Sequence, residues 1–148
     1  MRMWHKDLIH VLPQAQLVAQ WRECCCAARN IAVLGHPNHI LINRIMDYPM
    51  EHFIAYTQLV ANEMRERGMN PRWQRFMKWF SADHQWNYLN LRQEDIFKGW
   101  HNNRYLMQCY RNLQEKSDCG GIEWREFSPV ISLMAEKDLI AYDRSIDE

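Results

Sequence analysis

The stretch PQAQLVAQWRECCCAARNIAVLG, residues 13–35, predicts the longest helix of the chain. Its apolar side chains recur at spacings of three and four and form one stripe: Leu17, Trp21, Cys24, Ala28 and Ile31. We therefore expect about twenty helical residues, starting near Pro13 and ending before Gly35.

Helical start and stop signals recur through the rest of the chain. Four further helices are predicted at residues 49–68, at 71–80, at 102–116, and from Ser128-Pro129 through about Tyr142. The first of these has Pro49 at its start and Gly68 just past its end, the usual asymmetry of a helix. Residues 35–49 read as irregular or as a short helix. Strand-type alternation is not convincing anywhere, so the predicted fold class is all-α with about five helices.

The bulk composition is that of a globular protein. A chain of 148 residues has the size of one ordinary domain, and 47% apolar and 24% charged residues suit a packed core. We expect a single all-α domain over residues 1–148, and a cytoplasmic monomer with no membrane span and no signal peptide. The five cysteines have no C-x-x-C spacing, which favours reduced thiols over disulfides or a zinc site.

Charge is neutral in total but uneven along the chain. The net charge of zero argues mildly against a nucleic-acid partner. Residues 1–75, however, hold nine Lys and Arg against six Asp and Glu, and five of the seven His. A polyanion would therefore meet the first half of the chain first.

The polar side of the helix at residues 13–35 carries Glu23. Helical spacing aligns it with Gln16, Gln20, Ala27 and Asn30, opposite the apolar stripe, and Arg22, Cys26 and Arg29 border that line. The simplest interpretation is a solvated helix face. Of the neighbouring thiols, Cys24 belongs to the buried stripe, and Cys26 has no His at helical spacing to act as its base.

The residues around this acid resemble a known family. Residues 8–12, LIHVL, and 16–23, QLVAQWRE, are similar to the start of the pyrimidine-dimer DNA glycosylases typified by phage endonuclease V. The similarity continues through residues 37–41 and 63–68, and so covers about the first 70 residues. It implies an endonuclease V-like fold.

The resemblance also implies a mechanism. In that family the α-amino group of the chain attacks C1′ of the damaged nucleotide, expels the base and forms an imine. Glu23 would take the central catalytic role, assisting ring opening and β-elimination. Arg2 stands where the family has an N-terminal Thr, and a bulky second residue normally leaves the initiator in place, so the expected nucleophile is the amine of Met1. An α-amine is roughly a tenth unprotonated at pH 7, several hundred times more than a lysine.

The substrate implied by the resemblance is double-stranded DNA with a damaged or abasic site, cleaved by a DNA glycosylase and AP lyase without a cofactor or metal. The expected DNA contacts are Arg2, Gln16, Arg22, Arg29, Asn38, His39, Asn43 and Arg44. Gln16 and Cys26 replace a His and an Arg of the family, which thins the DNA contacts.

Other interpretations stay open. The chain could keep the fold as a non-catalytic nucleic-acid-binding or interaction module, or act on another base. The aromatic residues between Trp73 and Tyr88 suit core packing better than base stacking. His36 and His39 have a spacing that can chelate, but no nearby carboxylate or Cys completes a metal site.

Overall fold

A computed structural model describes residues 2–141 and places six α-helices in them. These are α1 (Gln14–Leu34), α2 (Ile40–Ile45), α3 (Met50–Glu66), α4 (Gln74–Met77), α5 (Asn103–Asp118) and α6 (Trp124–Glu136). Three 3₁₀ segments, η1 (Lys6–Val11), η2 (Tyr88–Asn90) and η3 (Gln93–Asp95), lie between them. No strand occurs in the described residues, which confirms the all-α class. None of their helices has the length and apolarity needed to cross a lipid bilayer.

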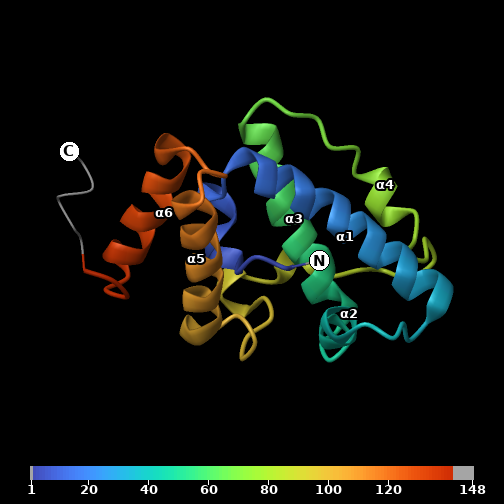
Figure 1. The fold of residues 1–148 in the computed structure, drawn as a ribbon. Helices are drawn as coiled ribbons and strands as arrows, with labels where there is room; N and C mark the ends of the chain where they lie inside the picture. Colours follow the sequence, from blue (N-terminus) through green and yellow to red (C-terminus); the bar gives the residue numbers. More distant parts are fainter. Residues whose placement is uncertain (1, 142–148) are drawn as a thin grey trace.

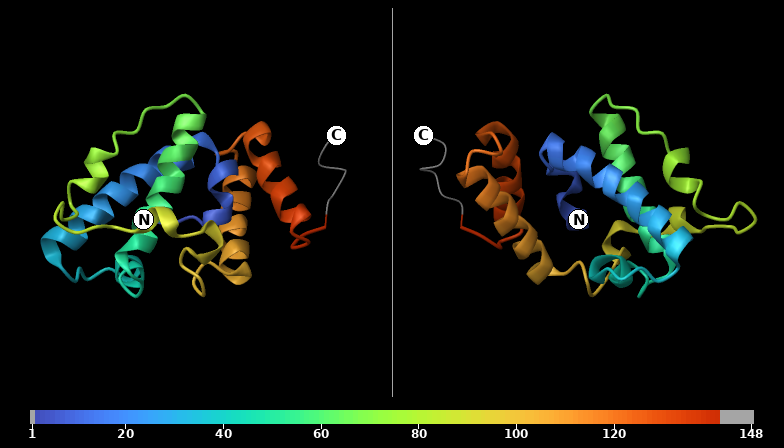
Figure 2. Two further views of the ribbon diagram at one scale, coloured as in Figure 1. Left: turned by 180° about the vertical axis from the view of Figure 1, so that it is seen from behind. Right: turned by 45° about the vertical axis from the view of Figure 1, so that its right-hand side comes forward.

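The helices form two groups. In Figure 1, α1 crosses α3, with α4 packed beside α1 and α2 near the start of α3. On the other side, α5 and α6 pack against each other, and both views of Figure 2 keep this arrangement. The first residues of the chain run between the two groups, and η1 contacts both α3 and α6. The N-terminal segment therefore lies at the centre of the fold.

The boundaries of α1 and α3 agree with those predicted from Pro and Gly. Each helix begins directly after a proline, Pro13 or Pro49. Gly35 and Gly68 follow the two helix ends with φ of 69° and 84°, a conformation that glycine adopts without steric cost. The helix predicted at residues 102–116 is α5, which begins and ends close to the expected positions.

Two predicted helices were wrong in their bounds. The aromatic helix expected at residues 71–80 is only the four-residue α4. Phe76 and Phe80 pack against Phe53, and Trp73 packs against Phe76. The last helix is not capped by Ser128-Pro129; α6 begins at Trp124 and ends at Glu136. Pro129 sits inside α6 on its exposed side, where water can satisfy the carbonyl that lacks a donor.

Burial of the N-terminal segment also corrects the predicted solvated line on α1. Met3, Trp4 and His5 are almost fully buried, and they cover Gln20, which has no exposed surface. Ala27 is buried as well, whereas Glu23 remains half-buried. The polar line of α1 is therefore mostly buried against other segments, and Glu23 lies where this line becomes accessible to solvent.

Candidate active site

The first residues of the chain lie along α1 and run antiparallel to it, so that Trp4 contacts Gln20 and Arg2 contacts Glu23. The backbone nitrogen of Trp4 donates a hydrogen bond to Gln20 Oε1 at 2.8 Å, and that of Arg2 donates to Glu23 Oε2 at 3.3 Å. The hydroxyl of Tyr56 donates to the carbonyl of Trp4 at 2.6 Å, and that of Tyr105 donates to the carbonyl of Met3. These four contacts come from α1, α3 and α5, so the whole fold fixes residue 2 beside the carboxylate.

A second set of buried polar groups anchors the segment further along. The backbone nitrogen of Lys6 donates to His101 Nδ1 at 3.0 Å, and its ammonium donates to the carbonyls of Glu94 and Ile96 at 2.7 Å each. Burial lowers the pKa of His5 to about 4 and that of His101 to about 2. Both imidazoles are therefore neutral in the folded protein at neutral pH.

Because these two histidines are buried in the neutral form, we expect the folded protein to lose stability at acidic pH. Their folded pKa values lie below the unfolded value of about 6.5, so the stability they contribute is fully present above pH 6.5. It is lost as the pH falls from 6.5 toward 4, because the unfolded chain then binds protons that the folded chain excludes. For His5 alone the loss is roughly 3 kcal/mol.

Urea unfolding between pH 7.5 and 4.5 measures this effect. The midpoint should fall steadily below pH 6.5 and be nearly constant above it. The matched control is His36→Gln, which changes an exposed histidine and should leave the pH dependence intact. A midpoint that stays constant down to pH 4.5 would contradict buried neutral histidines.

A cavity of about 400 Å³ opens at Glu23. Its walls come from the N-terminal segment, α1 and α5, and its lining residues are Arg2, Trp4, Ala15, Gln16, Ala19, Glu23, Asn112 and Lys116. The guanidinium carbon of Arg2 lies 5.4 Å from the ring centroid of Trp4. One carboxylate thus faces a space bordered by a guanidinium and an ammonium group, which suits a polar, anionic ligand.

Two polar atoms in this cavity have no partner. Gln16 Oε1 and Asn112 Oδ1 are buried and form no hydrogen bond within the described residues. A buried polar atom without a partner is costly, and the cost is removed if a ligand supplies the missing group. Because a rotated amide presents its NH₂ in place of its oxygen, each side chain can accept from a ligand or donate to it.

The structure brings together three of the predicted site residues and leaves the others outside the cavity. Arg2, Gln16 and Glu23 line it. Arg22 lines a neighbouring hollow, and Arg29 is exposed further along α1. The four remaining residues lie on or before α2: Asn38, His39, Asn43 and Arg44. Met1 lies outside the described residues.

The α2 residues have local roles of their own. His39 Nδ1 accepts a hydrogen bond from the backbone nitrogen of Ile42 at 3.4 Å and so caps α2. The guanidinium carbon of Arg44 lies 5.3 Å from the ring centroid of Trp100. Asn38 and Asn43 are exposed.

Sequence reasoning missed Asn112 and Lys116. They are four residues apart on α5, at the edge of the buried stripe of Leu106, Cys109 and Leu113. Helical spacing predicts that these two share a face. It does not predict that this face meets Glu23.

The cysteines contribute no activated thiol that the structure identifies. Cys24 is buried, and burial raises the pKa of its thiol to about 12. Among residues 2–141, no group of three or more His, Cys, Asp and Glu side chains is arranged to hold a metal ion.

The first half of the chain matches a known protein family. A family model described as pyrimidine dimer DNA glycosylase matches residues 1–77, just over half of the chain. These residues include the N-terminal segment, α1 and α3, and therefore Glu23 with the contacts that fix residue 2. No curated protein and no solved structure matches the chain.

Proposed function

The chain belongs to the pyrimidine dimer DNA glycosylase family, and from that premise we propose that it excises a damaged base and cleaves the resulting abasic site through an imine. The proposed nucleophile is the amine of Met1, and the proposed assisting group is the carboxylate of Glu23. The substrate is double-stranded DNA with a damaged or abasic site.

The observation that carries the proposal is the 3.3 Å distance between the nitrogen of Arg2 and Glu23 Oε2. Three covalent bonds join that nitrogen to the amine of Met1, which limits the distance between the two nitrogens to about 3.7 Å. This short tether supports a role for the amine of residue 1 beside the carboxylate. Removal of Met1 would instead expose the amine of Arg2, at the position of the family's Thr.

The reaction needs both groups. The amine lone pair forms a bond to C1′, the bond from C1′ to the base breaks, and the base departs with its electron pair. Loss of the amine proton and opening of the sugar at O4′ then give the imine. A carboxylate beside the amine can accept that proton and deliver it to O4′, the usual task of a general acid and base. Removal of a proton from C2′ finally expels the 3′ phosphate.

The other residues of the site would hold the DNA. Gln16 and Asn112 carry the unpartnered amide oxygens and would bond the extruded nucleotide, while Arg2 and Lys116 would neutralise phosphate. We propose that Arg22, Arg29, Asn38, His39, Asn43 and Arg44 contact the duplex outside the cavity. The neutral net charge suits binding through few phosphates, with a modest dependence on salt.

Borohydride trapping tests the proposal. The protein is incubated at low salt with duplex DNA that contains either an abasic site or a pyrimidine dimer, and borohydride is added. Reduction of an imine should give a covalent protein–DNA adduct, and the unreduced reaction should give a nicked strand. DNA binding without any adduct would instead favour a non-catalytic binding module. An adduct on abasic DNA alone would mean that the excised base is not a pyrimidine dimer.

A further inference from the structure

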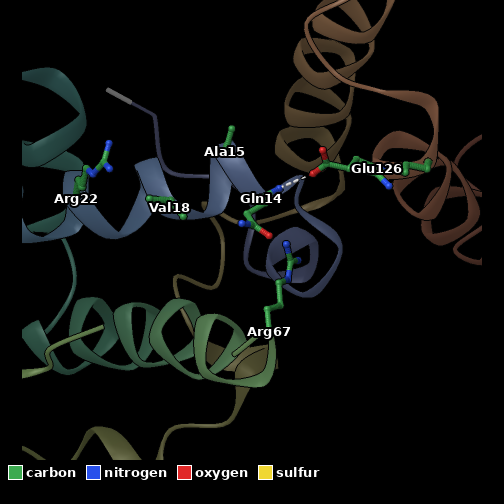
Figure 3. A pocket seen from close by; sticks show the side chains of 7 residues that line it. Gln14, Ala15, Val18, Arg22, Arg67 and Glu126 are labelled. Carbon is green, nitrogen blue, oxygen red and sulfur yellow. Dashed lines mark hydrogen bonds between the residues drawn. The ribbon is translucent and has the colours of Figure 1, made fainter. Parts of the chain in front are cut away.

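A second hollow of about 790 Å³ lies next to the Glu23 cavity, on the adjacent face of α1. Three arginines from three different helices line it: Arg22 of α1, Arg67 at the end of α3 and Arg125 of α6. Figure 3 shows Arg67 directed toward Gln14 at the start of α1, with Glu126 opposite. We call this hollow the arginine groove.

Arg67 is held in place within the groove. Its Nε lies 2.9 Å from Glu63 Oε2, and its Nη2 donates to the carbonyl of His10 at 3.4 Å. The side chain is only 23% exposed. Its Nη1 makes no hydrogen bond within residues 2–141, so two N–H groups on a pre-oriented guanidinium remain for a ligand.

The other two arginines are free to adjust. Arg125 Nε lies 3.0 Å from Glu123 Oε2, but both side chains are exposed, and such a surface pair holds its partners weakly. Arg22 is exposed and forms no ion pair with any described residue. Both guanidinium groups can therefore turn toward a bound anion.

Carboxylates limit the positive charge of the groove. Glu63 and Glu123 pair with two of its arginines, and Glu126 Oε2 accepts a hydrogen bond from the backbone nitrogen of Gln14 at 2.7 Å. The groove thus offers many N–H donors, of which those of Arg67 are held in place, but little excess charge. This composition suits phosphates that a neighbouring site has already brought close, rather than capture of a free anion from solution.

The groove and the Glu23 cavity share Ala15. Along α1, the residues that line the cavity and those that line the groove occupy adjacent faces about 100° apart. Ala15 and Ala19 form the ridge between them, and their small side chains leave the ridge low. A chain of phosphates that leaves Glu23 can cross this ridge directly into the groove.

We propose that the arginine groove holds the phosphate backbone of the DNA strand next to the reacting nucleotide, with Arg67 and Arg125 as its main contacts. This inference rests on the proposed function, because it takes the ligand at Glu23 to be a nucleotide in DNA. It assigns a binding role to α6 and to the end of α3.

Fluorescence anisotropy of labelled DNA tests whether the groove binds DNA, independently of the cleavage reaction. The probe is a duplex with a tetrahydrofuran abasic analogue, which cannot form an imine. Arg67→Gln and Arg125→Gln should each weaken DNA binding roughly tenfold, since each removes one phosphate contact. Each should also reduce by about one the magnitude of the slope in a plot of the logarithm of the association constant against the logarithm of the salt concentration. Arg67→Lys should keep most of the slope because it keeps the charge, which separates lost charge from a disturbed helix end.

The matched control is Arg92→Gln. Arg92 is also an exposed arginine in ion pairs, with Glu94 and Asp95, but it lines neither the groove nor the Glu23 cavity. It should leave the affinity and the salt slope unchanged. The same affinity and slope in the double variant Arg67→Gln/Arg125→Gln as in the parent protein would overturn the inference.

Two further measurements distinguish this inference from a free-phosphate site and from a failure of the proposed function. Titration of the parent protein with inorganic phosphate at constant ionic strength should give no saturable binding. Suppose instead that the parent protein binds phosphate saturably, and that the double variant loses this binding but keeps its affinity for DNA. The groove would then be a site for free phosphate, and the proposal would be overturned. Borohydride trapping of the double variant at saturating protein should still give an adduct. If the parent protein forms an adduct but the groove variants bind DNA with unchanged affinity, the role of the groove is rejected and the proposed chemistry stands. If the parent protein forms no adduct, the proposed chemistry is rejected.

Discussion

Replacing Glu23 by Gln is expected to lower the rate of strand cleavage at an abasic site by about 10²–10⁴-fold, the usual contribution of a general acid and base. The amide keeps the size of the side chain and can still accept a hydrogen bond from the nitrogen of Arg2. It cannot take up and return the proton that the imine and the sugar oxygen exchange. Single-turnover cleavage, followed on a denaturing gel at saturating protein, measures the loss.

Glu66→Gln is the matched control. Glu66 is an exposed glutamate at the end of α3 that lines neither the Glu23 cavity nor the arginine groove, and its change removes the same charge. It should cleave at the parent rate. Anisotropy should show that Glu23→Gln binds the abasic-analogue duplex at least as tightly as the parent, because a negative charge facing DNA has been removed. A cleavage rate in Glu23→Gln equal to that of the control would exclude Glu23 from the chemistry.

Local sequence signals were enough to predict much of the helical framework. The predicted buried stripe of α1 had five members: Leu17, Trp21, Cys24, Ala28 and Ile31. The first four are buried, and Ile31 is partly buried against the core. Proline before a helix and glycine after it gave the bounds of α1 and α3, since both residues act within one turn. The family resemblance over about the first 70 residues agrees with the match to residues 1–77.

Tertiary packing decided what these local signals could not. Gln20 looked like part of a solvated line, but it is fully buried, and the backbone nitrogen of Trp4 donates a hydrogen bond to its amide oxygen. The face of a helix that is polar by composition becomes buried when another segment supplies matched donors. Pro129 looked like a helix start, yet the buried face of α6, which includes Phe127 and Val130, extends the helix on both sides of it.

The candidate site was predictable only where α1 and the N-terminal segment form it. Arg2, Gln16 and Glu23 were found through the resemblance, and all three line the cavity. Asn112 and Lys116 come from α5, beyond the residues that the family model matches. Their pairing with Glu23 depends on how two helix groups dock around the N-terminal segment, and no spacing within α5 encodes that contact.

The second large effect concerns the nucleophile. A protein whose α-amino group has been acetylated is expected to give no borohydride adduct with abasic DNA, because an amide nitrogen has no available lone pair. Acetylation at neutral pH favours the α-amine, whose pKa of about 7.7–8.0 leaves far more of it unprotonated than a lysine at about 10.4. Gel electrophoresis measures the adduct, and mass spectrometry of the digested adduct identifies the modified residue.

Lys116 supplies the sharpest alternative, since its ammonium belongs to a residue that lines the same cavity as Glu23. Lys6 is a weaker one, because its ammonium is committed to the carbonyls of Glu94 and Ile96. Lys116→Arg keeps the positive charge but removes the amine, so this variant should still form the adduct while the acetylated protein does not. An adduct that survives acetylation and disappears in Lys116→Arg would move the nucleophile from the start of the chain to α5. In that case the contacts that fix residue 2 beside Glu23 would serve to shape the cavity rather than to deliver an amine.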